Sequence, residues 1–153
     1  MNSEEEAKYR LTLAEGYLRR AEEALTREDH FAVISNSQLA VENSAKAVIS
    51  CFRIPSWSHD PSSELLEVIE ENRDKIEKRI NSSIFHGLST LASYSRNLAP
   101  EHGRMSYGDP TLRIPPWDLA NSKRADESLS YAQHSVKISK EFIERWFKHT
   151  LTV

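Results

Sequence analysis

A short stretch from Arg96 to His102 holds the side chains of this sequence best suited to chemistry. It contains a permanent cation at Arg96, an amide at Asn97 and an imidazole at His102. Arginine can clamp a phosphate with a rigid fork of donors, and histidine moves a proton most readily near neutral pH. The two together are the minimum needed to cleave an RNA phosphodiester without a metal ion. The alternative is that Arg96 is an ordinary cation in the last turn of a helix and His102 is an exposed loop residue.

The spacing of these two residues makes one geometric demand. On a continuous helix, positions six apart differ by about 240° in direction, so Arg96 and His102 would diverge. Pro100 lies between them and disfavours helical geometry at Ala99. We therefore expect the helix to break there, so that the chain can fold His102 back toward Arg96. Alternatively, Arg96 of one protomer works with His102 of its partner across a two-fold axis.

The residues that follow are locally basic. Residues 96–124 hold five Lys or Arg against three Asp or Glu, whereas residues 1–30 hold eight acidic side chains against five basic ones. Arg104 belongs to this basic segment, and Tyr107 could stack on an exposed base, as in proteins that bind single-stranded RNA. A random fluctuation in charge, and a Tyr107 that merely sits in a Gly-Asp-Pro turn, are the alternatives. Asn97, Arg104 and Tyr107 are thus the expected supporting or RNA-binding residues.

The elements that must position these residues are helical. Apolar side chains recur every three to four positions, which predicts helices over residues 3–28, 30–52, 61–80, 83–98 and 118–149. Asp29, Asp60 and Asp118 are the expected caps of the second, third and last of them. Glycines and prolines mark residues 100–117 as the one long loop. The expected fold is an all-α, up-and-down bundle of about five helices in a single domain.

Four polar residues of the second helix and its connector, two of them as a pair, have alternative interpretations. Gln38 interrupts the apolar stripe, where a neighbouring helix satisfies it or where it fixes the register of packing. Glu42 and Lys46 lie four residues apart, as an exposed ion pair or as a partly buried pair near a dimer cleft. His59 precedes Asp60 either as the residue before a helix cap or as part of a functional motif.

The composition excludes several classes of protein. With 39% apolar residues, 28% charged residues and a net charge of −3, the chain is an ordinary globular protein and no general coat for nucleic acid. No apolar run approaches the ~20 residues that span a bilayer, and the acidic N-terminus does not resemble a signal peptide. Cys51 stands alone, so no intrachain disulfide can form, and a buried, inert thiol in the cytoplasm is expected.

Metal and cofactor chemistry is not expected from the motifs. The six histidines form no His-x-x-x-His or Glu-x-x-His pair of the kind that binds zinc or a di-iron centre. The sequence contains neither the glycine-rich phosphate loop of nucleotide-binding proteins nor the nucleophile elbow of serine hydrolases. We therefore expect no metal site and no cofactor.

The order of several motifs resembles the HEPN domain family over residues 7–147. The second helix contributes the run from Gln38 to Ala47. Beyond it, the motifs that carry the resemblance are His59-Asp60, Glu64-Leu65-Leu66, Arg96-Asn97, His102, Arg104, Tyr107-Gly108-Asp109-Pro110, Pro115, Ala125 and Ala132.

This resemblance implies a function and partners. Many HEPN domains are metal-independent endoribonucleases with an Arg, a polar residue and then a His after four to six intervening residues, which Arg96, Asn97 and His102 match. Members often dimerise so that two motifs face one cleft, and small members often pair with a minimal nucleotidyltransferase that acts as antitoxin. Paired toxins often carry a Tyr two residues after the His, where this chain has Arg104. Other members are non-catalytic partners, so an adaptor for a nucleotidyltransferase or a nucleotide is the alternative.

A homodimer is expected on two grounds. One is the resemblance. The other is that Trp117, Trp146 and Phe147 are more large rings than the outer face of one small bundle is expected to carry.

Overall fold

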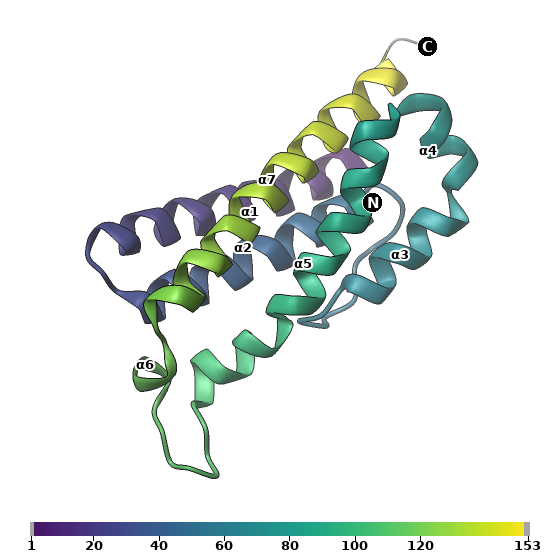
Figure 1. Ribbon diagram of the computed structural model, residues 1–153. Helices are drawn as coiled ribbons and strands as arrows, with labels where there is room; N and C mark the ends of the chain where they lie inside the picture. The colour runs from purple at the N-terminus through teal and green to yellow at the C-terminus, as the bar shows by residue number, and fades with distance from the viewer. Residues whose placement is uncertain (1, 152–153) are drawn as a thin grey trace.

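The chain folds into seven α-helices within the residues that the structure describes (Figure 1). The computed structural model describes residues 2–151, and of residues 149–151 the backbone alone. The prediction of an all-α bundle is confirmed, although about five helices were expected and the predicted long loop over residues 100–117 is largely helical. The helices are α1 (Ser3–Thr26), α2 (His30–Ser50), α3 (Ser62–Glu71), α4 (Arg73–Arg79), α5 (Ser82–Tyr107), α6 (Pro116–Leu119) and α7 (Ser122–Leu151).

Helix α2 lies at the centre of the bundle. It packs against α1, α5 and α7, and Figure 1 shows α3 and α4 on the outer side of α5. Every residue from 40 to 50 is buried, which is far more than the single apolar stripe of a surface helix requires. Gln38, Glu42 and Lys46 are therefore enclosed by protein, where a polar group is costly unless it is paired.

Side-chain caps set four of the helix starts in the described part of the chain, at Asn2, Asp29, Asn81 and Asn121. The carboxylate of Asp29 accepts a hydrogen bond of 3.0 Å from the backbone N–H of Ala32, as predicted. The predicted cap at Asp118 is wrong, because Asp118 lies in α6. Helix α7 begins at Ser122, where Asn121 accepts a hydrogen bond of 2.8 Å from the backbone N–H of Arg124. An asparagine oxygen serves as well as a carboxylate at this position.

The third expected helix is divided in two. Helix α3 begins at Ser62 and ends at Glu71, and α4 follows directly from Arg73. Asn72 has non-helical backbone angles, and its side-chain amide donates to the carbonyl oxygen of Val68 at 2.8 Å. This local bond competes with the helical ladder, as Asn side chains commonly do.

Helix α5 is longer than the sequence predicts. It continues through Pro100 to Tyr107, so the prediction that the chain leaves the helix before His102 is wrong. Leu98, Glu101 and Met105 are buried on either side of the proline, so continuing the helix keeps one face packed against the bundle. Proline cannot donate to the carbonyl one turn earlier and crowds it, which bends a helix. Figure 1 shows α5 changing direction in its last third.

The remaining loop is short and closed by backbone hydrogen bonds. Asp109 and Ile114 form an antiparallel bridge, with N–H···O distances of 2.8 and 3.0 Å. Gly108 ends α5 with φ +70° and ψ −147°, a conformation essentially restricted to glycine.

Replacing Gly108 by alanine is expected to destabilise the protein by about 1–3 kcal/mol. The positive φ is strained for any side chain, and the new Cβ would lie 2.1 Å from the carbonyl oxygen of Ile114. Gly103→Ala is the matched control, because its Cβ would meet nothing within 4 Å and the position is helical. That control should stabilise by about 0.5–1 kcal/mol. Urea denaturation of the two variants measures both effects, and equal stabilities would contradict this account of the loop.

Two aromatic residues near the end of α7, which were expected on the outer face of the bundle, lie in the core. Trp146 and Phe147 are buried, and the Trp146 ring lies 4.9 Å from that of Phe52. The prediction that they crowd an outer face is therefore wrong, and they give no argument for a dimer. Cys51 is buried as predicted, and burial raises the pKa of its thiol, which keeps it unreactive.

Candidate active site

Arg96 and His102 both contact one short segment, residues 59–63, that leads from α2 into α3. The Nε of Arg96 donates to Oγ of Ser62 at 3.3 Å, and its Nη2 donates to Oγ of Ser63 at 3.1 Å. The ring of His102 stacks on that of His59, with centroids 3.5 Å apart and planes at 17°. Two residues six apart on α5 are thereby brought to the same five-residue segment.

The segment itself is tied down at its helix end. The carboxylate of Asp60 accepts hydrogen bonds from the backbone N–H of Ser62 at 3.1 Å and from its hydroxyl at 2.6 Å. The same hydroxyl accepts the bond from Arg96. A guanidinium held by two hydroxyls keeps its charge facing a solvent-accessible hollow.

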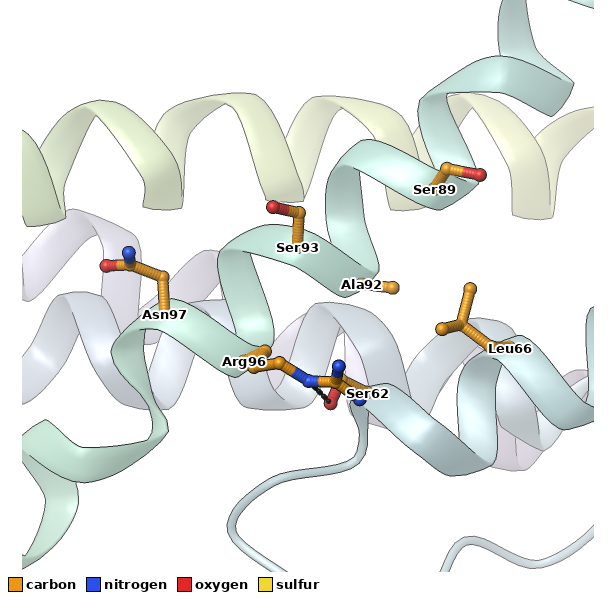
Figure 2. A pocket seen from close by; sticks show the side chains of 7 residues that line it. All are labelled: Ser62, Leu66, Ser89, Ala92, Ser93, Arg96 and Asn97. Carbon is orange, nitrogen blue, oxygen red and sulfur yellow. Dashed lines mark hydrogen bonds between the residues drawn. The ribbon is translucent and has the colours of Figure 1, made fainter.

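That hollow has a volume of about 470 Å³ and lies between α3 and α5. Figure 2 shows Arg96 reaching across it toward Ser62, while Asn97 points to another side of α5. Its lining residues are Ser62, Leu66, Ser89, Ala92, Ser93, Arg96 and Asn97.

A chain of polar contacts along α2 supports the stacked rings. The Nδ1 of His59 lies 3.0 Å from Oε1 of Glu42, and the Nδ1 of His102 lies 3.2 Å from Oε1 of Gln38. The side-chain amide of Gln38 donates to the same Glu42 oxygen at 3.0 Å. The Nζ of Lys46 binds the other oxygen, Oε2, at 3.1 Å. These four contacts form one network, in which two lie within α2 and two connect α2 to the imidazoles.

These contacts determine which ring nitrogen carries a proton. Because the amide nitrogen of Gln38 donates to Glu42, its oxygen is left to accept from Nδ1–H of His102. The Glu42 carboxylate accepts from Nδ1–H of His59 in the same way. This assignment follows from the hydrogen-bond network. The Nε2 atoms of both rings therefore face away from α2.

The surroundings of His102 favour its neutral form. Partial burial lowers its pKa, and the neighbouring His59 and Lys46 lower it further, against the opposing effect of the Glu42 carboxylate. A neutral imidazole with a free Nε2 lone pair can accept a proton near neutral pH.

Glu42, His59 and His102 also place three potential metal-binding atoms within 4.8 Å of one another. Both oxygens of Glu42 already accept hydrogen bonds, one of them from a lysine ammonium. The two rings lie face to face, whereas imidazoles that share one ion aim their nitrogens at it. The cluster as it stands is arranged for hydrogen bonding and proton transfer.

The three expected supporting residues make their contacts away from residues 59–63, although Asn97 also lines the hollow beside Arg96. Asn97 accepts two hydrogen bonds from Arg124 of α7, at 3.2 Å through its side chain and at 3.3 Å through its carbonyl. Arg104 faces the same helix, with its Nε 3.8 Å from the buried carboxylate of Glu101. Tyr107 is the exposed last residue of α5. Arg96 and His102 thus share contacts with residues 59–63, whereas Asn97 and Arg104 interact with Arg124 and Glu101, and Tyr107 is exposed at the end of α5.

The sequence analysis did not identify Glu42 and Lys46 of α2, or His59, as candidate site residues. Glu42 and Lys46 form a buried pair, with side-chain exposures of 7% and 6%, so the interpretation as an exposed ion pair is wrong. The signal was Gln38, whose amide interrupts an apolar stripe one turn before Glu42. His59 was visible as part of a motif, but its contacts could not be predicted, because they depend on the path of the connector.

Comparison with known families gave one match. The family model described as "HEPN domain" matches residues 7–149. The chain is a member of the HEPN domain family. Comparisons with curated proteins and with solved structures gave no match. In this HEPN domain, none of the described helices is both long and apolar enough to cross a membrane.

Proposed function

We propose that this HEPN domain is a metal-independent endoribonuclease in which Arg96 binds the scissile phosphate and His102 moves a proton. The observation that carries the proposal is the shared docking of both side chains on residues 59–63. Attack of a ribose 2′-OH on the adjacent phosphorus gives a 2′,3′-cyclic phosphate and a free 5′-OH. General acid–base help is worth ~10²–10⁴-fold, and a preorganised cation at the phosphate adds to it.

The proposal is tested by incubating labelled RNA with the purified protein in EDTA. Cleavage that is lost in both Arg96→Ala and His102→Ala supports it. Intact RNA together with co-purification of a nucleotidyltransferase would instead support a non-catalytic adaptor.

Asn97, Arg104 and Tyr107 are the proposed RNA-binding residues. Alanine at each of them should weaken RNA binding more than it slows the reaction at saturating RNA.

The partners we propose are RNA, a second copy of the chain and a nucleotidyltransferase antitoxin, in the cytoplasm. The structure supplies a reason for the second copy. Three large apolar side chains of the connector and α3 are exposed, namely Ile54, Trp57 and Leu66, and Trp57 is 96% exposed. Leu66 lines the hollow beside Arg96, so a dimer formed on this face would bring two sites together.

We expect sedimentation at micromolar concentration to give twice the chain mass of 17.6 kDa. Trp57→Glu should yield the monomer, because a charge in an apolar interface must be desolvated. Leu112→Glu is the matched control, since Leu112 is also exposed but lies in the loop after α5. A monomer for the unsubstituted protein, or equal behaviour of the two variants, would contradict a dimer on this face.

A further inference from the structure

We propose that His59 is a second catalytic residue, which protonates the 5′-oxygen leaving group while His102 takes the proton from the 2′-OH. This assignment rests on the proposed ribonuclease activity and deepens it. It gives each of the two stacked imidazoles a separate role. It also gives Glu42 and Gln38 positioning roles through the rings that they hold.

The geometry of the pair suits one substrate bond. Both Nδ1 edges face neighbouring groups of α2, so both Nε2 edges face outward together. The rings are nearly parallel and 3.5 Å apart. In two-metal phosphoryl-transfer sites, ions ~3.5–4 Å apart clamp the attacking and leaving oxygens of an in-line displacement. Two stacked rings at a similar separation can serve the same two oxygens by exchanging protons with them.

The two imidazoles differ in their exposure to solvent. The side chain of His59 is 53% exposed and sits on the connector, while His102 is half-buried on α5. The more open ring can therefore meet a leaving strand that departs into solvent. The segment that carries His59 also holds the Arg96 guanidinium, through Ser62 and Ser63, so that the cation and both imidazoles contact the same five residues.

The two rings have different hydrogen-bond partners. The Nδ1 of His59 lies 3.0 Å from the Glu42 carboxylate, which can pair with a cationic ring, whereas the Nδ1 of His102 lies 3.2 Å from the neutral amide oxygen of Gln38. Two cationic rings at this separation would repel each other, so one ring serves as the acid and the other as the base. The charged and titratable groups around the pair are Glu42 and Lys46 of α2, Asp60 of the connector and Arg96 of α5.

The reaction balances without a metal or another reactant. Nε2 of neutral His102 takes the 2′-OH proton as the 2′-oxygen bonds to phosphorus. The bond from phosphorus to the 5′-oxygen breaks, and that oxygen takes the proton from Nε2 of His59. The products are a 2′,3′-cyclic phosphate and a 5′-OH. The proton now on His102 and the one missing from His59 exchange with water to restore the starting state.

A substrate with a different leaving group distinguishes a catalytic role of His59 from a structural one. An RNA substrate with sulfur in place of the 5′-bridging oxygen releases a thiolate, whose conjugate acid has a pKa of about 8.5 and which leaves without an acid. We expect His59→Asn to slow cleavage of ordinary RNA ~10²-fold or more, and to cleave the sulfur substrate nearly as fast as the unsubstituted protein. His102→Asn should remain slow on both substrates. His86→Asn, at an exposed histidine of α5 remote from the connector in sequence, is the control.

A His59→Asn defect of equal size on both substrates would overturn the assignment, because a structural role does not depend on the leaving group. A second measurement needs no variant. The rate of the unsubstituted protein on ordinary RNA should fall at high pH, where the acid loses its proton, and this fall should be absent with the sulfur substrate. The same fall on both substrates would also overturn the assignment. No cleavage of ordinary RNA by the unsubstituted protein would overturn the proposed function itself.

Discussion

Replacing His102 by asparagine is expected to slow RNA cleavage by ~10²–10⁴-fold, the usual contribution of a general acid or base. The substitution removes the outward Nε2 that accepts the proton. The new side-chain amide can still donate to the Gln38 oxygen that now accepts from Nδ1 at 3.2 Å. The fold should therefore survive, and single-turnover cleavage under saturating enzyme measures the chemical step.

The control for this prediction is stability. His102 is only half-buried, so His102→Asn and the control His86→Asn should unfold at similar urea concentrations. A loss of activity that tracks a matching loss of folded protein would remove His102 from the chemistry. An unchanged cleavage rate in a folded variant would do the same.

Replacing Glu42 by alanine is expected to cost about 3–5 kcal/mol of stability, the range for breaking a buried ion pair. It leaves the Lys46 ammonium inside the bundle with its partner gone, since this nitrogen lies 3.1 Å from the carboxylate and the side chain is only 6% exposed. It also removes the acceptor of Gln38 and His59. Urea denaturation monitored by far-UV circular dichroism measures the loss.

A double substitution distinguishes the broken pair from a simple cavity. Glu42→Leu with Lys46→Met removes both charges, and a buried pair replaced by apolar residues is often no less stable than the original. The double variant should therefore be more stable than either single variant. The exposed pair of Arg73 and Glu70 is the control, and Glu70→Ala should cost under about 1 kcal/mol. Additive losses in the double variant would contradict the account.

Local patterns predicted the helices well and their interruptions poorly. Asp29 caps α2 because capping depends on residues three positions apart, which a sequence shows directly. Pro100 was expected to end a helix, yet α5 continues because Leu98 and Met105 keep their places in the core on either side of it. Packing against distant helices decides between a bend and a break, and no local pattern records that packing.

The same limit applies to the site. The spacing of Arg96 and His102 identified the candidate pair, but it did not indicate that His59 would stack on His102. His59 meets Glu42 across 17 positions of sequence and stacks on His102 from another element. Gln38 was visible as a polar residue in an apolar stripe, while its two partners were not. Contacts of this range depend on how the connector crosses the bundle.

The most direct test of the central claim uses one labelled oligonucleotide in two forms, with EDTA present throughout. The first form is a DNA strand with a single ribose at the cleavage position, and the second carries deoxyribose there. The account predicts cleavage of the first alone, 3′ to the ribose, with a 2′,3′-cyclic phosphate end that is absent when Arg96 or His102 is replaced by alanine. Cleavage of the all-deoxy strand, or a product with a 5′-phosphate, would contradict it.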